Sequence, residues 1–351
     1  MLQRTLAFVS SFLFLSLSAL AGTLPVNQMV VFGDSLSDDG NAYLVYTYDH
    51  AAFPAGAPAP IPPNYTTGAY TDGMDTTPAS AHPGSVWVQD LAVSLGLPVP
   101  AASLGPTFGA PAGPSYTDYA VGSAVTGGPL YSNAYPSMNA QVTQYLGSSP
   151  SSPASALYVL WGGANDLLDV NPASLPGNPL LLQTAATDAI TNLAGEISAL
   201  AAAGGKYFVW ADLPPLGSIP ATQGNPAYDA ALNAASLSFQ QQWAAGIPQL
   251  QQANPGITII GVDVYSLFEN LIANPGGLNV TGIPQGNASV NPDAYLFWDG
   301  LHPTNVGHGL VAAAALDAIE AIPEPTTAGL LFFGCVGMVG VRFLRRKLTP
   351  N

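Results

Sequence analysis

A serine, an aspartate and a histidine stand in positions where they could act together as nucleophile, orienting acid and base. Ser35 comes directly after Gly33 and Asp34, at the end of a short apolar run. Far downstream, Asp299 and His302 lie three residues apart in a turn rich in Gly and Pro. A serine hydroxyl needs a base to lose its proton near neutral pH, and that base needs a carboxylate to hold its tautomer. The spacing of Asp299 and His302 lets the carboxylate and the imidazole lie side by side.

The segment around Ser35 supports two interpretations equally when it is taken alone. The apolar run at 29–32 predicts a buried strand that stops at a tight turn, and a hydroxyl at the tip of such a turn can be a nucleophile. In the other interpretation Ser35 caps the following helix, because Ser is favoured at that position. The Asp299–His302 turn favours the first interpretation, with His302 taking the serine proton and Asp299 stabilising the imidazolium.

The same chemistry requires hydrogen-bond donors for the negative oxygen of a tetrahedral intermediate, each worth about 3 kcal/mol of barrier in known cases. The candidates are the backbone N–H of Ser35, the backbone N–H of Gly122 and the side-chain amide of Asn165. Gly122 lies among small residues, which allow a backbone N–H to approach a ligand closely. The reaction requires no metal or other cofactor, and we expect none because the chain has no Cys/His cluster and no HExxH spacing.

The elements that must bring these residues together alternate between strands and helices. Apolar runs predict strands at 29–32, 118–124, 156–161, 206–210 and 257–262. Helical patterns occur at 85–96, 138–146, 180–203, 228–250, 264–273 and 305–319. This alternation predicts an α/β fold with a parallel sheet covered on both faces, whose carboxyl edge is where sites form. The Pro- and Tyr-rich stretch 43–73 predicts a surface loop.

Composition excludes several classes of partner. The formal net charge is −15, and between residues 22 and 322 Lys206 is the one basic residue against twenty acidic ones. Such a body does not bind nucleic acid through its phosphates and is repelled by anionic membrane surfaces. The single cysteine, Cys335, lies in a C-terminal apolar run, so no intrachain disulfide can form.

Both ends of the chain predict export and membrane insertion. Residues 1–21 carry Arg4, an apolar run and a small-residue cleavage site, as a secretory signal peptide does. At the other end, residues 322–351 contain an apolar run at 328–341, which predicts a C-terminal apolar helix, followed by a basic cluster. The run is short for a membrane span of about 20 residues, but the basic cluster favours a span with the body outside. We therefore expect a signal peptide at 1–21, a globular domain at 22–321 and a membrane-inserted tail at 322–351.

Four segments in a fixed order resemble the four sequence blocks of the GDSL-type SGNH hydrolases. They are Gly33-Asp34-Ser35-Leu36, the segment around Gly122, Gly163-Ala164-Asn165-Asp166 and Asp299-Gly300-Leu301-His302-Pro303-Thr304. The resemblance covers about residues 28–321 and is closest to the branch of secreted esterases, lipases and phospholipases. It implies a flavodoxin-like three-layer α/β/α sandwich with a parallel sheet and hydrolysis of esters or thioesters.

By the same resemblance, Ser35 is the nucleophile, His302 the base and Asp299 its partner. Gly122 and Asn165 complete the oxyanion hole with the Ser35 N–H. Ser123 stands where many relatives have a second glycine, so its N–H is an alternative donor to that of Gly122.

The tail resembles the PEP-CTERM sorting signal of Gram-negative bacteria, with Pro323-Glu324-Pro325 before the apolar run and the arginine cluster. This resemblance implies an exosortase-type processing enzyme as a partner and a mature protein released from or attached to the cell surface. The expected substrate is a small ester, a lipid or an acylated sugar. Two alternatives remain open at this point, namely an exopolysaccharide O-deacetylase of the same fold and a catalytically silent surface or matrix protein.

Overall fold

The computed structural model describes residues 24–53, 57, 59–65, 68–73, 84–109, 115–128, 136–148 and 153–322. The predicted signal peptide at 1–21 and nearly all of the predicted tail, from 323 to 351, lie outside these residues. The domain boundaries at 22–321 therefore stay a prediction, although residues Pro25–Ile319 form one compact unit. Within the described ranges, no helix is both long and apolar enough to cross a membrane.

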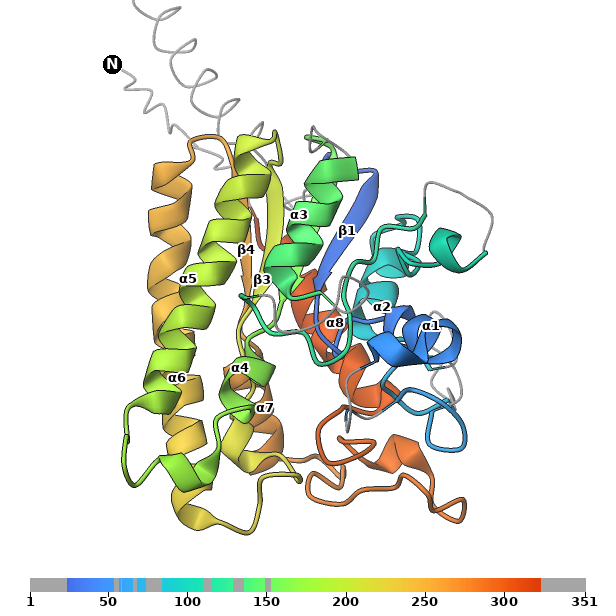
Figure 1. Cartoon of the computed structure of the whole chain (residues 1–351), viewed down its shortest axis with the longest axis vertical. Coiled ribbons are helices and arrows are strands. Elements are labelled where there is room, and N and C mark those ends of the chain that lie inside the picture. The colour runs from blue at the N-terminus through green and yellow to red at the C-terminus, as the bar shows by residue number, and fades with distance from the viewer. Residues whose placement is uncertain are drawn as a thin grey trace, which may run out of the picture. The chain divides into compact units, whose positions relative to one another are not determined.

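Four parallel strands form the sheet that positions the site (Figure 1). They are β1 (Gln28–Gly33), β2 (Ala156–Trp161), β3 (Tyr207–Ala211) and β4 (Thr258–Val262), and they lie in the order β1-β2-β3-β4. The last residues of neighbouring strands are paired, Gly33 with Trp161 and Ala211 with Val262. The carboxyl ends of the strands therefore meet at one edge of the sheet, as predicted.

The strand predicted at 118–124 is reduced to a single bridge at the outer side of β1. Val31 pairs in parallel with Asp118 there. The Val31 N–H donates to the Thr117 carbonyl at 2.9 Å, and the Tyr119 N–H donates to the Val31 carbonyl at 2.8 Å. This segment thus extends the sheet beyond β1, on the side away from β2, and brings the residues after it to the carboxyl edge.

Among the residues that the structure describes, eight α-helices are connected to these strands, and those predicted from the sequence are found within a few residues of their expected bounds. They are α1 (Asn41–Tyr48), α2 (Trp87–Ser94), α3 (Met138–Ser148), α4 (Ala164–Leu168), α5 (Leu181–Ala202), α6 (Pro226–Ala253), α7 (Val264–Ala273) and α8 (Asn305–Glu320). The helix α1 was not predicted, because it falls largely in the stretch 43–73 whose composition indicates a loop.

Aromatic contacts of β2 show that helices cover both faces of the sheet. The ring of Tyr158 lies 6.0 Å from that of Tyr145 in α3, whereas the ring of Trp161 lies 5.4 Å from that of Trp87 in α2. Residues three apart in a strand point to opposite faces, so α3 and α2 lie on opposite sides. Every residue of β2 is buried, as expected for a central parallel strand. In Figure 1, α3 and α5 stand in front of the sheet.

Candidate active site

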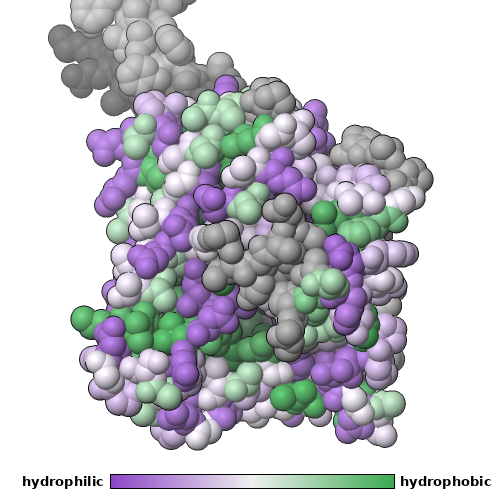
Figure 2. Space-filling model, viewed as in Figure 1, coloured by the Kyte–Doolittle hydropathy of each residue, from purple (hydrophilic) through white to green (hydrophobic). Residues whose placement is uncertain are grey.

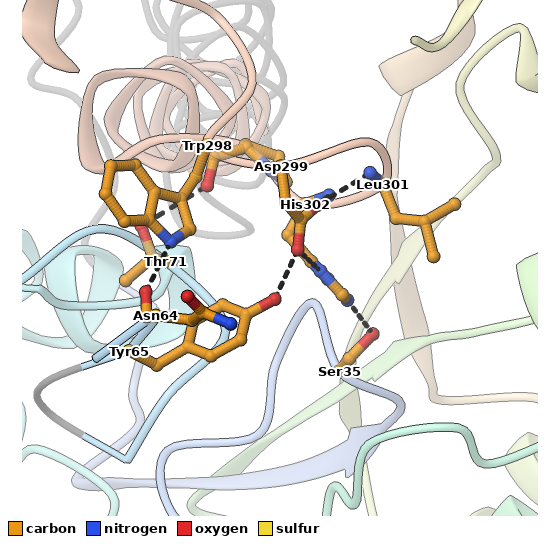
Figure 3. Close-up of polar contacts among 9 residues, drawn as sticks. Ser35, Asn64, Tyr65, Thr71, Trp298, Asp299, Leu301 and His302 are labelled. Atoms are coloured by element: carbon orange, nitrogen blue, oxygen red, sulfur yellow. Dashed lines mark hydrogen bonds and ion pairs between the residues drawn. The ribbon is translucent and has the colours of Figure 1, made fainter. Parts of the chain in front are cut away.

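The structure brings Ser35, His302 and Asp299 into one chain of hydrogen bonds (Figure 3). The Nε2 atom of His302 lies 2.9 Å from the Ser35 hydroxyl oxygen, and its Nδ1 atom lies 2.7 Å from Asp299 Oδ2. A carboxylate can only accept, so Nδ1 carries the proton and Nε2 is left to accept from the serine. Residues Ser35 and His302 are 9% and 3% exposed. The imidazole is therefore oriented to take the serine proton.

The turn that presents Ser35 is fixed by its backbone. The Gln141 side chain of α3 bonds both the N–H and the carbonyl of Gly33, at 3.0 and 2.9 Å. The N–H groups of Ser37 and Asp38 both donate to the Asp34 carbonyl. The helix α1 begins only at Asn41, and its N-cap residue is Gly40 rather than Ser35. The interpretation of Ser35 as a helix cap is therefore wrong.

The carboxylate of Asp38 links the first sequence block to the second. Its Oδ1 accepts the N–H groups of Gly40 and Asn41, and its Oδ2 accepts those of Ala42 and Gly122. Burial raises the pKa of Asp38 to about 6, and these four donors act in the opposite direction. One buried carboxylate thus holds the start of α1 and the Gly122 segment together.

The prediction that the Gly122 N–H faces the oxyanion requires correction. This N–H donates to Asp38 Oδ2 at 2.8 Å, so it is not available to donate to an oxyanion. Gly122 has a different reason to lack a side chain, because a Cβ atom there would lie 2.4 Å from the hydroxyl oxygen of Tyr70. The Tyr70 ring in turn lies 4.8 Å from the His302 ring. Gly122 therefore makes room for an aromatic neighbour of the imidazole.

Ser123, the alternative named from the sequence, has the features that Gly122 lacks. It lines the pocket beside Ser35, and its N–H donates to no other described residue. Its φ of 60° lies in the left-handed region, which L residues with a side chain rarely adopt. An observed backbone outlier of this kind is a reason to look for function, and this one belongs to a residue that lines the pocket beside Ser35.

Asn165 lies at the start of α4 and also lines the pocket. One proton of its amide bonds the Ala124 carbonyl at 2.9 Å, which orients the side chain and leaves the second proton for a ligand. The Ser35 N–H likewise donates to no other described residue. The structure therefore offers three donors at this edge, from Ser35, Ser123 and Asn165.

The Asp299 carboxylate is held as an anion by four donors. Its Oδ1 accepts the N–H groups of Leu301 and His302 at 2.6 and 2.7 Å, and its Oδ2 accepts His302 Nδ1 and the hydroxyl of Tyr65. Burial by itself raises the pKa of Asp299, but the imidazole and these hydrogen bonds outweigh it and hold the pKa well below its usual range. Sequence reasoning missed Tyr65, which lies in the stretch predicted as a loop.

A cavity of about 790 Å³ opens at Ser35. Apolar side chains from the end of β2, from α4 and α7 and from the loops after the strands contribute to its lining, among them Trp161, Leu168, Leu216, Ile219, Phe268 and Phe297. Figure 2 shows hydrophobic residues gathered over and beside α4 on this face. Asp34 and Asp169 are its acidic lining residues, and burial raises the pKa of both, that of Asp34 to about 7. The cavity is therefore mostly apolar, and its described lining contains no Lys or Arg.

In the described ranges, no group of three or more His, Cys, Asp or Glu side chains is placed to hold a metal ion.

Comparison with known proteins gives this site a family. The sequence model of the GDSL-like lipase/acylhydrolase family matches residues 29–315. Two Arabidopsis thaliana proteins named GDSL esterase/lipase are each 25% identical, one over 86% of this chain and 84% of its own length, the other over 85% and 92%. A solved acetyl xylan esterase, AlAXEase, has a TM-score of 0.36 at 13% identity, covering 83% of this chain and 98% of its own. The family match spans most of the chain and includes Ser35, Asp299 and His302. The chain therefore belongs to the GDSL-like lipase/acylhydrolase family and is an ester-cleaving hydrolase.

Proposed function

We propose that this chain hydrolyses carboxylic esters through an acyl-enzyme formed on Ser35. The observation that carries the proposal is the hydrogen-bonded chain from Asp299 through His302 to Ser35, which opens onto an apolar cavity. An intact series of hydrogen bonds from Asp299 to Ser35 disfavours the alternative of a catalytically silent surface protein, because such a protein has no need to keep these bonds.

In the first half of the reaction, the Ser35 oxygen attacks the ester carbonyl carbon while His302 Nε2 takes the serine proton. The carbonyl oxygen becomes an oxyanion, which the N–H groups of Ser35 and Ser123 and the amide of Asn165 stabilise. When the tetrahedral intermediate collapses, the carbon–oxygen bond to the alcohol breaks and His302 gives its proton to the departing alcohol. The acyl group is then esterified to Ser35.

In the second half, a water molecule attacks the acyl carbon while His302 takes one of its protons. The new tetrahedral intermediate collapses, the bond to the Ser35 oxygen breaks, and His302 returns the proton to that oxygen. The carboxylic acid leaves, and the enzyme is restored. Throughout the cycle, the ionised Asp299 holds the imidazole and balances its positive charge.

The cavity favours an uncharged ester with an acyl chain of several carbons over an acetyl ester. Phe268, Phe297 and Leu216 contribute apolar side chains to its lining, which suits an acyl chain. Each buried methylene contributes about 0.8 kcal/mol. The described lining contains no Lys or Arg to pair with an anionic head group, which disfavours such a group. The exopolysaccharide O-deacetylase is therefore the less favoured alternative.

We expect kcat/KM for p-nitrophenyl octanoate to exceed that for the acetate by at least about 10-fold, because two buried methylenes already account for that ratio. The measurement is kcat/KM for acetate, butyrate, octanoate and palmitate esters, with acetylated xylan as a polymeric acetyl substrate. Leu216→Trp, which fills the cavity, should move the preference toward acetate. Leu180→Trp is the matched control at a position that is 64% exposed and should leave the ratio unchanged. A wild-type preference for acetyl substrates would contradict the proposed preference for longer acyl chains. It would leave the proposed ester hydrolysis unaffected.

We also propose that the chain is exported and reaches the cell surface or the medium of a Gram-negative bacterium. The signal-peptide pattern at 1–21 and the PEP-CTERM-like tail at 322–351 support this, with the tail inserted in the membrane until an exosortase-type enzyme processes it. We expect the full chain in the envelope or the medium, and a chain lacking 322–351 to lose its membrane-bound precursor. Cell fractionation measures both, and a full-length chain found only in the cytoplasm would rule the proposal out.

A further inference from the structure

We propose that Tyr65 is a positioning residue of the active site, whose hydroxyl holds the Asp299 carboxylate in the orientation that His302 requires (Figure 3). This inference rests on the proposed function, since it assigns a role within that reaction. Tyr65 comes from the chain segment that follows α1 and lies 234 residues before Asp299 in the sequence.

The geometry of Asp299 shows what the tyrosine adds. Two backbone N–H groups of its own turn, from Leu301 and His302, hold Oδ1. These two N–H groups do not contact Oδ2, which is the oxygen that His302 Nδ1 bonds. The Tyr65 hydroxyl donates to this same Oδ2 from a different part of the chain. A second donor on Oδ2 therefore fixes the plane of the carboxylate against the imidazole.

The tyrosine hydroxyl stays protonated at neutral pH and can therefore act as a donor. Burial raises the pKa of Tyr65, and the negative charge of Asp299 raises it further. Its hydroxyl therefore keeps its proton, while Asp299 stays ionised. The hydrogen bond is one between a neutral donor and an anion, which is the stronger kind.

The ring that carries this hydroxyl is firmly anchored. Tyr65 is 3% exposed, and it belongs to a hydrophobic cluster with Ala42 and Val45 of α1 and with Tyr70, Leu104 and Val121. The rings of Tyr65 and Tyr70 meet edge to face, with centroids 5.5 Å apart. Close packing of this kind limits the ring to one rotamer, so the position of the hydroxyl is set by the cluster.

The neighbours of Tyr65 tie the same segment to both sides of the Asp299–His302 turn. On one side, the indole N–H of Trp298 donates to the Asn64 carbonyl at 2.9 Å. On the other, the Thr71 hydroxyl donates to the Pro303 carbonyl at 3.3 Å. We call residues 59–65 and 68–73 the strap. The strap therefore contacts the turn before Asp299, at Asp299 itself and after His302.

A purely structural role for Tyr65 makes a different prediction from a positioning role. If the Tyr65 hydroxyl only holds the strap in place, removal of the hydroxyl lowers the free energy of unfolding and leaves the pH dependence of catalysis unchanged. If the hydroxyl positions Asp299, its loss leaves the carboxylate with one donor fewer and more negative charge beside the base, so the acid limb of catalysis moves to higher pH. The acid limb of the kcat/KM profile distinguishes the two.

We expect Tyr65→Phe in the full chain to lower kcat for p-nitrophenyl octanoate about 10-fold, because a misplaced carboxylate misplaces the base. We expect KM to stay within about twofold, and the acid limb to move up by about half a pH unit. The measurement is kcat and KM from pH 5 to pH 9, with thermal unfolding alongside. Tyr145→Phe is the matched control, since Tyr145 is 5% exposed and its hydroxyl lies 3.2 Å from that of Tyr158, in a core contact between α3 and β2. It should show the wild-type kcat and pH profile.

Trp298→Phe gives a second test at a half-buried site, and it keeps an aromatic ring against the Tyr65 cluster. It removes the bond to Asn64, and we expect a smaller fall in kcat with a shift of the acid limb in the same direction. An unchanged acid limb in both variants, with any loss of kcat matched by lost folded protein, would overturn the proposal. Failure of the proposed function would look different, because the wild type would then show no Ser35-dependent ester hydrolysis.

Discussion

Replacing Ser35 with alanine is expected to lower kcat/KM for an octanoyl ester by about 10⁴-fold or more, which is the effect of removing the nucleophile in other serine hydrolases. The Ser35 hydroxyl is bonded to His302 Nε2 at 2.9 Å, and without it no acyl-enzyme can form. The turn is held by backbone bonds to the Asp34 carbonyl, so the fold should be unchanged. The measurements are kcat/KM, thermal unfolding and labelling by a serine-directed fluorophosphonate probe.

Ser37→Ala is the matched control within the same turn. The Ser37 hydroxyl accepts the indole N–H of Trp87 at 3.0 Å, so it serves packing and lies away from the imidazole. Its loss leaves a buried donor unpaired and should lower stability by about 1–3 kcal/mol. The variant should still take up the fluorophosphonate probe, whereas Ser35→Ala should not. Full activity in Ser35→Ala would refute the acyl-enzyme mechanism.

The sheet could be predicted from the sequence because its strands have a local signature. The run 156–161 is continuously apolar and is flanked by Ser and Gly, and β2 has those same bounds. The helix at 264–273 was likewise predicted with the bounds of α7. A strand buried on both faces cannot carry polar residues, so the pattern is strong. The alternation of strands and helices then predicts a parallel sheet, and the place of the site follows from the edge where the strands end.

The donors of the oxyanion hole could be predicted only in part. Asn165 was identified because it ends a strong strand signal. Gly122 was assigned on its lack of a side chain, yet its N–H is turned to Asp38, a residue 84 positions away. No local pattern reports such a contact. The sequence did offer one indication, because Ser123 stands where many relatives have a second glycine. In the structure Ser123 has the left-handed φ that glycine adopts easily.

The strap could not be predicted, for a related reason. Residues 59–73 have the Pro and Tyr content of a surface loop. Their shape is set by long-range bonds, such as those of Tyr65 with Asp299 and of Asn64 with Trp298, each joining residues 234 positions apart. A single sequence contains no record of these pairings. Ser35, Asp299 and His302 could thus be predicted from the sequence. The strap residues that hydrogen-bond to the Asp299–His302 turn could not.

The role of Asp299 can be tested with asparagine, because the structure dictates how the amide must sit. The N–H groups of Leu301 and His302 require an acceptor at the Oδ1 position, so the amide oxygen stays there. The amide NH₂ then replaces Oδ2 and faces His302 Nδ1. Since NH₂ is a donor, Nδ1 must accept, and the imidazole proton moves to Nε2. That nitrogen then points a proton at Ser35 and cannot take one from it.

We therefore expect Asp299→Asn to lower kcat/KM about 10³- to 10⁴-fold, with the fold and the substrate KM nearly unchanged, because the imidazole is held in the wrong tautomer. The variant should also remain slow toward the fluorophosphonate probe, whose reaction needs the same proton transfer. The measurements are kcat/KM, the rate of probe labelling and thermal unfolding. Asp293→Asn, six residues earlier in the same loop and outside the hydrogen-bond chain, is the matched control and should stay within about twofold of the wild type. If Asp299→Asn kept more than about one tenth of the activity, the tautomer argument would fail, and His302 would be shown to act as a base without the orientation that Asp299 and Tyr65 supply.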